Sequence, residues 1–289
     1  MSDMVRSFDV VRVRGGRRGA DVDRAATEEP LEIRLHGRPF AVVMRTPGAD
    51  RELAAGFLLA EQVISGSDDL GTIEYCTERQ PQSSQSRLSK EVSALSASSA
   101  VASENIVNVT LMDQARVERA LADRRQVTTN SSCGMCGRRT IESLTANVAP
   151  VASTWTMPAP ILLRLPERLR AAQAGFDETG GLHAAGLFTP DGQLADHAED
   201  VGRHNAVDKV VGRMLLREAL PLSQHLLCVS GRTSFEIVQK AVLAGIPIVA
   251  AVSAPSSLAI ELAHESGITL VGFVRGDSFN IYAHPQRIT

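Results

Sequence analysis

Several features that would assign a chain to a protein class at once are missing from this sequence. Only 4 of its 289 residues are cysteines, too few for a disulfide framework in a chain of this length. The longest apolar run, residues 241–254, is interrupted by Gly245 and Pro247 and is too short to span a bilayer as a helix. The N-terminus leads into mixed charge without an apolar core, so no signal peptide is recognised. These absences predict a protein of the reducing cytoplasm, without a membrane segment.

Positive charge and nucleotide-binding signatures are scarce as well. The formal net charge is −3 at pH 7, so the chain has no general basic field that would indicate a nucleic-acid partner. Neither the Walker A pattern nor G-x-G-x-x-G is present, which argues against an ordinary NTPase or a dinucleotide dehydrogenase. The 44% hydrophobic content is ordinary for a globular protein and allows a large core.

Two of the four cysteines, Cys133 and Cys136, form a C-x-x-C pair at the predicted start of a helix. Apolar residues recur on one face between positions 141 and 148, which indicates that helix. The helix N-terminus and the adjacent Arg138 and Arg139 would both favour a thiolate over a thiol. We therefore expect an unusually acidic thiol in this stretch.

Three interpretations of the C-x-x-C pair compete. A zinc site usually needs four ligands, and the other cysteines, Cys76 and Cys228, are isolated. Burial of two small residues would leave the neighbouring glycines and arginines unexplained. The favoured interpretation is sulfur chemistry, in which a thiolate exchanges disulfides or carries sulfane sulfur as a persulfide.

The first part of the chain is predicted to contain a flexible leader and a small lobe rich in β-strands. Residues 1–27 form the charged leader, and residues 28–118 form the lobe. The elements expected in the lobe are a hairpin of residues 31–35 and 40–44, a helix over 50–64 and strands near 72–76 and 106–111. Within the lobe, residues 80–103 are rich in serine and show no apolar period, so they predict a disordered insertion.

Residues 119–289 are predicted to form an α/β lobe. The elements expected there are a helix over 166–174 ended by Gly175, a hairpin that leads into a helix after residue 202, strands 226–230, 248–252, 268–274 and 279–283, and helices 235–244 and 257–266. Short strands joined by crossover helices imply a parallel arrangement with both faces of the sheet buried. Five polar residues are expected to form a pocket wall: His183, Asp200, Arg203, His204 and Asp208.

The loops that leave the carboxyl ends of these strands are rich in small hydroxyl residues, glycine and arginine. They comprise Ser230, Gly231, Arg232, Thr233 and Ser234, then residues 253–257, then Arg275, Gly276, Asp277 and Ser278. Two of these loops run into helices, and the serines of either one, taken alone, are explained as helix caps. Three such loops on one edge of an open α/β sheet favour a ligand that carries phosphate.

Several sequence blocks together resemble the FdhD family, the sulfur carriers that serve formate dehydrogenase. The blocks are residues 28–31, 46–48, 56–59, 131–137, 179–185, 199–209, 230–240 and 245–276. The resemblance covers nearly everything from residue 27 onward. It implies a cytidine-deaminase-like three-layer α/β sandwich with a mixed, largely parallel C-terminal sheet, a smaller β-rich N-terminal lobe and a homodimer.

The resemblance also implies an activity and a site. Members of this family take sulfane sulfur from a cysteine desulfurase and pass it to the molybdenum or tungsten of a bis(molybdopterin guanine dinucleotide) cofactor before its insertion into formate dehydrogenase. By this resemblance, Cys133 carries the persulfide and Cys136 is its partner. The family's cofactor-binding stretch corresponds to Phe273, Val274, Arg275, Gly276, Asp277 and Ser278. No permanently bound metal is expected.

Two alternatives to sulfur transfer remain. A zinc-dependent deaminase needs H-x-E upstream of P-C-x-x-C, whereas here His197-Ala198-Glu199 lies downstream and Cys133 follows Ser132. A chaperone that only binds the cofactor would need the phosphate-binding loops but no reactive sulfur.

Overall fold

The centre of the molecule is a six-stranded mixed sheet. The computed structural model describes residues 4–76, 105–123 and 150–289. The sheet order is β12-β11-β10-β9-β7-β8, in which β9, β10 and β11 are parallel and the other pairings are antiparallel. The strands are β7 His183–Phe188, β8 Leu194–Asp200, β9 Leu226–Val229, β10 Ile248–Ala251, β11 Thr269–Arg275 and β12 Ser278–Ala283. The predicted parallel core and the predicted last strand are confirmed, and the last strand is antiparallel to β11.

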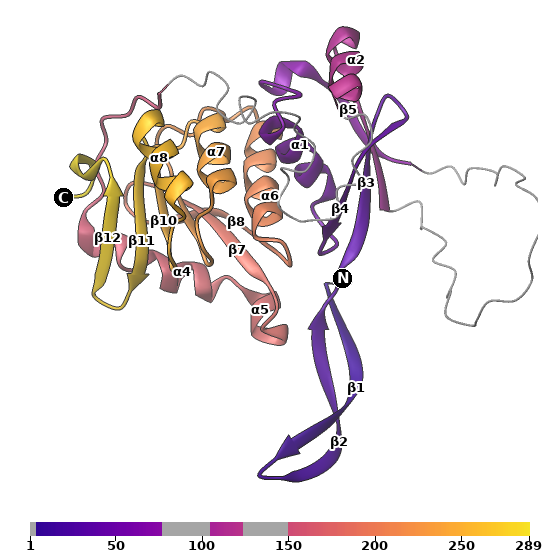
Figure 1. Ribbon diagram of the computed structural model, residues 1–289, viewed down its shortest axis with the longest axis vertical. Coiled ribbons are helices and arrows are strands. Elements are labelled where there is room, and N and C mark those ends of the chain that lie inside the picture. Colours follow the sequence, from indigo (N-terminus) through magenta and orange to yellow (C-terminus); the bar gives the residue numbers. More distant parts are fainter. Residues whose placement is uncertain (1–3, 77–104, 124–149) are drawn as a thin grey trace, which may run out of the picture.

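Helices cover both faces of this sheet, which explains why its central strands are almost continuously apolar. One face carries α6 Arg203–Leu216, α7 Phe235–Leu243 and α8 Ser257–Ser266. The other face carries α3 Ala159–Leu162 and α4 Leu165–Ala171, whose leucines pack with Phe188, Cys228 and Val274. Figure 1 shows these helix, sheet and helix layers, and they confirm the predicted α/β sandwich.

A smaller four-stranded sheet lies beside α1, with the order β4-β3-β6-β5. Its elements are β3 Glu29–Leu35, β4 Arg38–Arg45, α1 Asp50–Ala60, the short 3-10 helix Ser67–Asp69, β5 Leu70–Tyr75, β6 Ile106–Leu111 and α2 Gln114–Asp123. The predicted hairpin is confirmed as β3 and β4. Helix α2 runs across residue 118, where the lobe boundary is predicted.

The first helix ends four residues before the predicted position. Gln62 adopts a left-handed conformation, with φ of 57°, and its N–H donates to the Leu59 carbonyl at 2.9 Å. The Val63 N–H donates to the Leu58 carbonyl at 2.9 Å, which completes a Schellman motif. Because that motif keeps Val63 and Ile64 buried, the apolar pattern continues beyond the end of the helix.

Helices α1 and α6 join the two lobes through an unusually close contact. A Cβ atom added to Gly56 would lie 2.0 Å from the Asp208 carbonyl oxygen, and one added to Gly212 would lie 1.9 Å from the Glu52 carbonyl oxygen. Only glycine permits this approach of the two backbones. One continuous hydrophobic core therefore runs from β3 to β12.

A buried polar network reinforces the same junction. The Asp200 carboxylate lies 2.7 Å from the Lys209 ammonium and accepts a hydrogen bond from the Thr46 N–H at 3.1 Å. Lys209 also donates to the Thr46 carbonyl at 2.8 Å. Asp200 and Lys209 are 0% and 2% exposed, so the pairing offsets a large desolvation cost. The network fixes the residue after β4 against the end of β8 and the middle of α6.

Two further predictions differ from the structure. The predicted helix over 166–174 is two helices, α4 and α5 Ala174–Thr179, and Gly175 lies inside the second. The Glu199 carboxylate accepts the Gly175 N–H at 2.8 Å, so the glycine serves a close tertiary contact and Gly180 ends the helix. The leader predicted as a flexible tail instead forms β1 Val5–Arg14 and β2 Arg17–Ala26, paired along their full length. Alternating valines on β1 favour a strand.

Two segments named above lie outside the described residues, namely the C-x-x-C helix and the serine-rich insertion. Within residues 4–76, 105–123 and 150–289, no helix is both long and apolar enough to cross a membrane.

Candidate functional site

The loops after β9, β10 and β11 meet at one edge of the central sheet, as their sequence predicts. The Thr233 N–H donates to the Ala254 carbonyl at 3.2 Å, and the Ser256 N–H donates to the Thr233 carbonyl at 2.9 Å. The Phe273 N–H donates to the Ser253 carbonyl at 3.2 Å. These bonds join the first loop to the second and the second loop to the end of β11, which forms one continuous rim. The parallel direction of the strands places their carboxyl ends together.

The first loop is only partly free to meet a ligand. Ser230 extends the ladder, because its hydroxyl accepts the Ala184 N–H at 2.9 Å. Gly231 faces His183 across the edge, with its Cβ position 3.4 Å from the His183 Nδ1 atom. Arg232 is exposed, whereas Thr233 is 1% exposed and its hydroxyl has no hydrogen-bond partner in the described part of the chain. The loop therefore offers one arginine and one unsatisfied hydroxyl.

The two helices that begin at this edge use their N-cap serines differently. Ser256 caps α8 by accepting the Ala259 N–H at 3.3 Å, which is the purely structural role. Ser234 makes no such bond at α7, because its hydroxyl lies 3.0 Å from His204 Nε2. From the sequence, both serines were expected only to cap helices, so the contact between Ser234 and His204 was not predicted.

Glu236, in the first turn of α7, is a site residue that the sequence did not single out. Its carboxylate lies 3.6 Å from His204 Nε2. Burial alone would raise the pKa of this carboxyl, but hydrogen bonds from His204 and Ser234 outweigh burial and lower the pKa to about 2. Glu236 is therefore ionised at neutral pH. The sequence feature that could have identified it is an acidic residue in the first turn of a helix, where the helix dipole favours negative charge.

The predicted pocket wall divides into two parts. His183, Arg203 and His204 lie at the carboxyl edge. Burial lowers the pKa of His183, with further lowering from the charges of Arg203 and His204, so its imidazole is neutral at pH 7. Asp200 and Asp208 do not line a pocket, because each is buried against a lysine; Asp208 lies 2.5 Å from Lys240. That part of the prediction is wrong.

The turn between β11 and β12 forms the far end of the rim. Phe273 is 36% exposed with a φ of 55°, whereas Val274 is 1% exposed and belongs to the core below α3 and α4. The Arg275 Nε atom donates to the Val252 carbonyl at 2.7 Å, which aligns this side chain with the second loop. Gly276 adopts a φ of 56° at the turn before Ser278. Of these residues, Arg275 presents the strongest anion-binding group.

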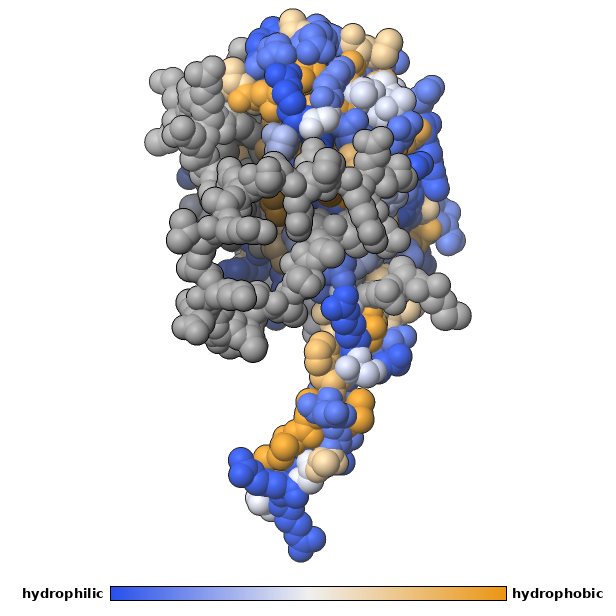
Figure 2. Space-filling view, turned by 90° about the vertical axis from the view of Figure 1, so that its right-hand side faces the viewer, coloured by the Kyte–Doolittle hydropathy of each residue, from blue (hydrophilic) through white to orange (hydrophobic). Residues whose placement is uncertain are grey.

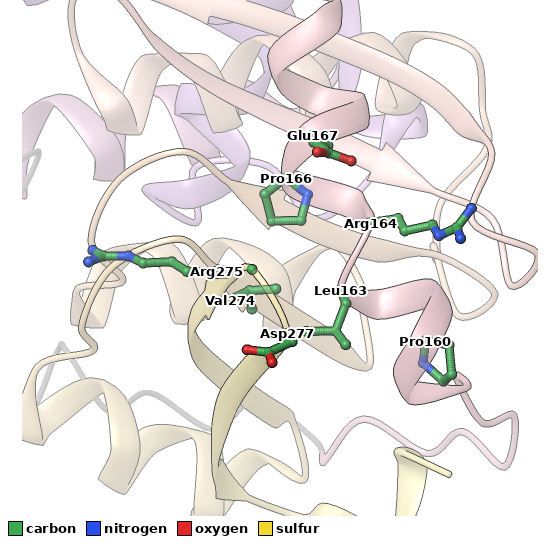
Figure 3. Close-up of a pocket in the computed structure, with 9 residues that line it drawn as sticks. Pro160, Leu163, Arg164, Pro166, Glu167, Val274, Arg275 and Asp277 are labelled. Carbon is green, nitrogen blue, oxygen red and sulfur yellow. The ribbon is translucent and has the colours of Figure 1, made fainter.

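A pocket of about 370 Å³ lies between this turn and the α3–α4 segment. Its lining residues are Pro160, Leu163, Arg164, Pro166, Glu167, Val274, Arg275, Gly276 and Asp277. Figure 3 shows the guanidinium groups of Arg164 and Arg275 pointing away from each other on opposite sides of the pocket. The turn thus adjoins two places for a ligand, the rim on the α7–α8 side and this pocket on the α4 side.

The cysteines behave differently from one another. Cys133 and Cys136 lie outside the described residues, and their predicted role stays a prediction. Cys228 is fully buried in β9, and burial raises the pKa of its thiol to about 12. In the described ranges no three His, Cys, Asp or Glu side chains are grouped to hold a metal ion, a finding that does not reach the C-x-x-C pair.

Comparisons with known proteins extend over nearly the whole chain. A protein of Streptomyces coelicolor named sulfur carrier protein FdhD is 49% identical, with 96% of this chain and 94% of that protein covered. Proteins of the same name are 48% identical in Mycobacterium tuberculosis, over 91% of each chain, and 42% identical in Saccharolobus solfataricus, over 100% of each.

A solved structure gives the same result for the fold. The crystal structure assigned to a formate dehydrogenase accessory protein from Desulfotalea psychrophila matches with a TM-score of 0.74 and 25% identity. The match covers 99% of this chain and 100% of that one. The sequence profile of the FdhD/NarQ family matches residues 26–289. The chain therefore belongs to the FdhD/NarQ family, as the resemblance of its motifs predicted.

Proposed function

We propose that this protein is a sulfur carrier for the maturation of formate dehydrogenase. The observation that carries the proposal is the nearly full-length match to relatives named sulfur carrier protein FdhD. The sequence supplies the chemical group that such a carrier needs, the C-x-x-C pair of Cys133 and Cys136 beside two arginines.

Uptake is a thiol exchange that needs no net oxidant. The Cys133 thiolate attacks the outer sulfur of a persulfide on a cysteine desulfurase. The S–S bond of that persulfide breaks, and the desulfurase cysteine leaves as a thiolate. Delivery of that sulfur as sulfide to a bis(molybdopterin guanine dinucleotide) molybdenum cofactor would leave a Cys133–Cys136 disulfide, which a thiol reductant reopens. The molybdenum cofactor is the acceptor substrate in this scheme.

The rim of the central sheet is where we place the guanine nucleotide part of that acceptor. Thr233 keeps an unsatisfied buried hydroxyl there, and Arg203 keeps a buried Nε atom without a hydrogen-bond partner among the described residues. Arg232 and Arg275 add guanidinium groups at the two ends of the rim. Buried polar groups in a folded protein are rarely left unsatisfied, and phosphate oxygens are suitable acceptors for all four groups.

Intact-mass measurement tests the sulfur-carrier proposal directly. After incubation with a desulfurase and cysteine, the wild-type chain is expected to gain the mass of one sulfur atom, and a thiol reductant should remove it. A chain that binds guanine nucleotide but never gains sulfur would instead be the chaperone considered above.

Arg275→Ala is expected to weaken the binding of GDP, a probe that lacks the pterin and the metal. Loss of one charge-assisted hydrogen bond typically costs about 1.5–3 kcal/mol, so the affinity should fall roughly ten- to a hundredfold. Calorimetric titration of GDP measures this change. The matched variant is Arg164→Ala, which removes an arginine from the α4 side of the same turn. If only Arg164→Ala weakened the binding of GDP, the nucleotide would be assigned to that pocket and not to the rim.

A further inference from the structure

The pocket between α4 and the β11–β12 turn combines apolar walls with two carboxylates. Its volume of about 370 Å³ falls within the roughly 300–1,000 Å³ that small-molecule sites occupy. Leu163, Pro166 and the buried Val274 supply apolar surface. Glu167 and Asp277 supply the carboxylates, and Figure 3 shows these two side chains on opposite sides of Pro166 and Val274. The pocket therefore suits a flat ring with apolar faces and with hydrogen-bond donors at its edge.

Both carboxylates are exposed and keep their acceptor oxygens for a ligand. Within residues 4–76, 105–123 and 150–289, neither Glu167 nor Asp277 takes part in an ion pair or a side-chain hydrogen bond. The two arginines that line the pocket are directed elsewhere. The guanidinium of Arg164 points away from that of Arg275, and Arg275 donates to the Val252 carbonyl at 2.7 Å. The negative charge of the pocket is therefore not neutralised from within.

Glu167 is the better placed of the two carboxylates for selective recognition. It lies in the first turn of α4, and the same helix places Leu165 and Leu169 in the core together with Val274. This packing holds the backbone of Glu167 in a fixed position above the apolar wall. Asp277 instead lies in the exposed turn after Gly276. Side chains on packed helices bind a ligand with more precise geometry than side chains on loops.

The donor pattern of a ring decides whether a carboxylate can bind its edge. A carboxylate accepts two parallel N–H donors, one on each oxygen. Guanine and pterin share a 2-amino-4-oxopyrimidine ring, in which a ring N–H and the amino group point in the same direction. Adenine has a ring acceptor beside its amino group, which a carboxylate repels. Hypoxanthine keeps the ring N–H but lacks the amino group. A carboxylate at the edge of this pocket therefore selects guanine or pterin.

We propose that this pocket binds the 2-amino-4-oxopyrimidine edge of a guanine or pterin ring and that Glu167 accepts its two N–H donors. The inference rests on the proposed function, because the molybdenum cofactor in that scheme carries both rings. It adds a ring site on the α4 side of the turn to the phosphate site on the rim, and Arg275 borders both. The N-terminal hairpin of β1 and β2, which projects from the body (Figure 2), supplies none of the lining residues.

Calorimetric titration of the full chain with matched pairs of rings tests the proposal. GDP is compared with IDP, whose hypoxanthine lacks the 2-amino group. Neopterin is compared with the lumazine that has the same side chain, in which an oxo group replaces the amino group. The wild type is expected to bind the amino-bearing member of at least one pair about tenfold more tightly or better, because that member donates one more hydrogen bond to a charged acceptor.

Glu167→Gln keeps the size of the side chain but replaces one acceptor oxygen with a donor group, so the preference for the amino-bearing ring should disappear. The control is Glu265→Gln, which makes the same change at an exposed position near the end of α8 and should keep the wild-type preference. A preference confined to GDP would assign the pocket to guanine, and one confined to neopterin would assign it to pterin.

Two results would overturn the proposal: a wild type that discriminates within neither pair, and a Glu167→Gln chain that keeps the wild-type preference. Intact mass after incubation with a desulfurase and cysteine separates this outcome from a failure of the proposed function, because sulfur uptake needs no cofactor. A chain that gains sulfur but shows no ring preference refutes the ring site alone. A chain that never gains sulfur refutes the sulfur carrier, whatever its ring preference.

Discussion

Replacing Cys133 with alanine is expected to abolish both the uptake of sulfane sulfur and the activation of formate dehydrogenase. Alanine removes the sulfur atom that would form the persulfide. The resemblance to the FdhD family assigns the persulfide to Cys133, and the predicted helix start with Arg138 and Arg139 would favour a thiolate in this stretch. Intact mass after incubation with a desulfurase measures uptake, and formate dehydrogenase activity in cells that lack the native carrier measures delivery.

The structure supplies matched controls for this experiment. The Cys228 side chain is fully buried, and because its thiol has a pKa raised to about 12, it is almost entirely protonated at pH 7. Cys228→Ala should therefore take up sulfur like the wild type, and so should Cys76→Ala. A Cys133→Ala chain that still activates formate dehydrogenase would refute the assignment. If Cys136→Ala alone lost uptake, the two cysteines would exchange roles.

Gly212→Ala is expected to destabilise the fold strongly, because it places a methyl group between α1 and α6. The new Cβ atom would lie 1.9 Å from the Glu52 carbonyl oxygen and 2.6 Å from the Gly56 nitrogen. Both neighbours are backbone atoms of α1, so relief requires the two helices to separate. Overpacking of this kind typically costs 1–3 kcal/mol or more, whereas the better helix propensity of alanine returns about 1 kcal/mol. Because both contacts are with backbone atoms, we expect a cost at the upper end of that range and a net loss of about 2 kcal/mol.

Urea denaturation of the full chain measures this loss as a lower transition midpoint. Gly66→Ala is the matched control, because a Cβ atom there meets nothing within 4 Å and the backbone is extended. Equal midpoints for Gly212→Ala and Gly66→Ala would show that α1 and α6 can move apart without a loss of stability. Gly56→Ala should behave like Gly212→Ala, since its Cβ atom would lie 2.0 Å from the Asp208 carbonyl oxygen.

Local patterns in the sequence were sufficient to predict most of the strands and helices. The nearly continuous apolar runs of β9, β10 and β11 predicted a sheet buried on both faces, and the left-handed glycines after α7 and α8 marked the ends of those helices. The meeting of three loops at one edge followed from parallel strands alone. These features are set by the periodicity of side chains and by the conformations that glycine permits, which each segment carries by itself.

The tertiary structure decided what each exposed or polar group contacts. Ser234 and Ser256 begin equivalent helices, yet only Ser256 acts as a cap, because α6 brings His204 within 3.0 Å of Ser234. Asp200 and Asp208 were predicted at a pocket, but Asp200 at the end of β8 and Asp208 in α6 both contact buried lysines. The periodicity of apolar residues indicates that one face of a segment is buried, but it does not indicate which distant segment covers that face. Which segment covers the face depends on how the layers pack, and this packing involves residues that lie far apart in the chain.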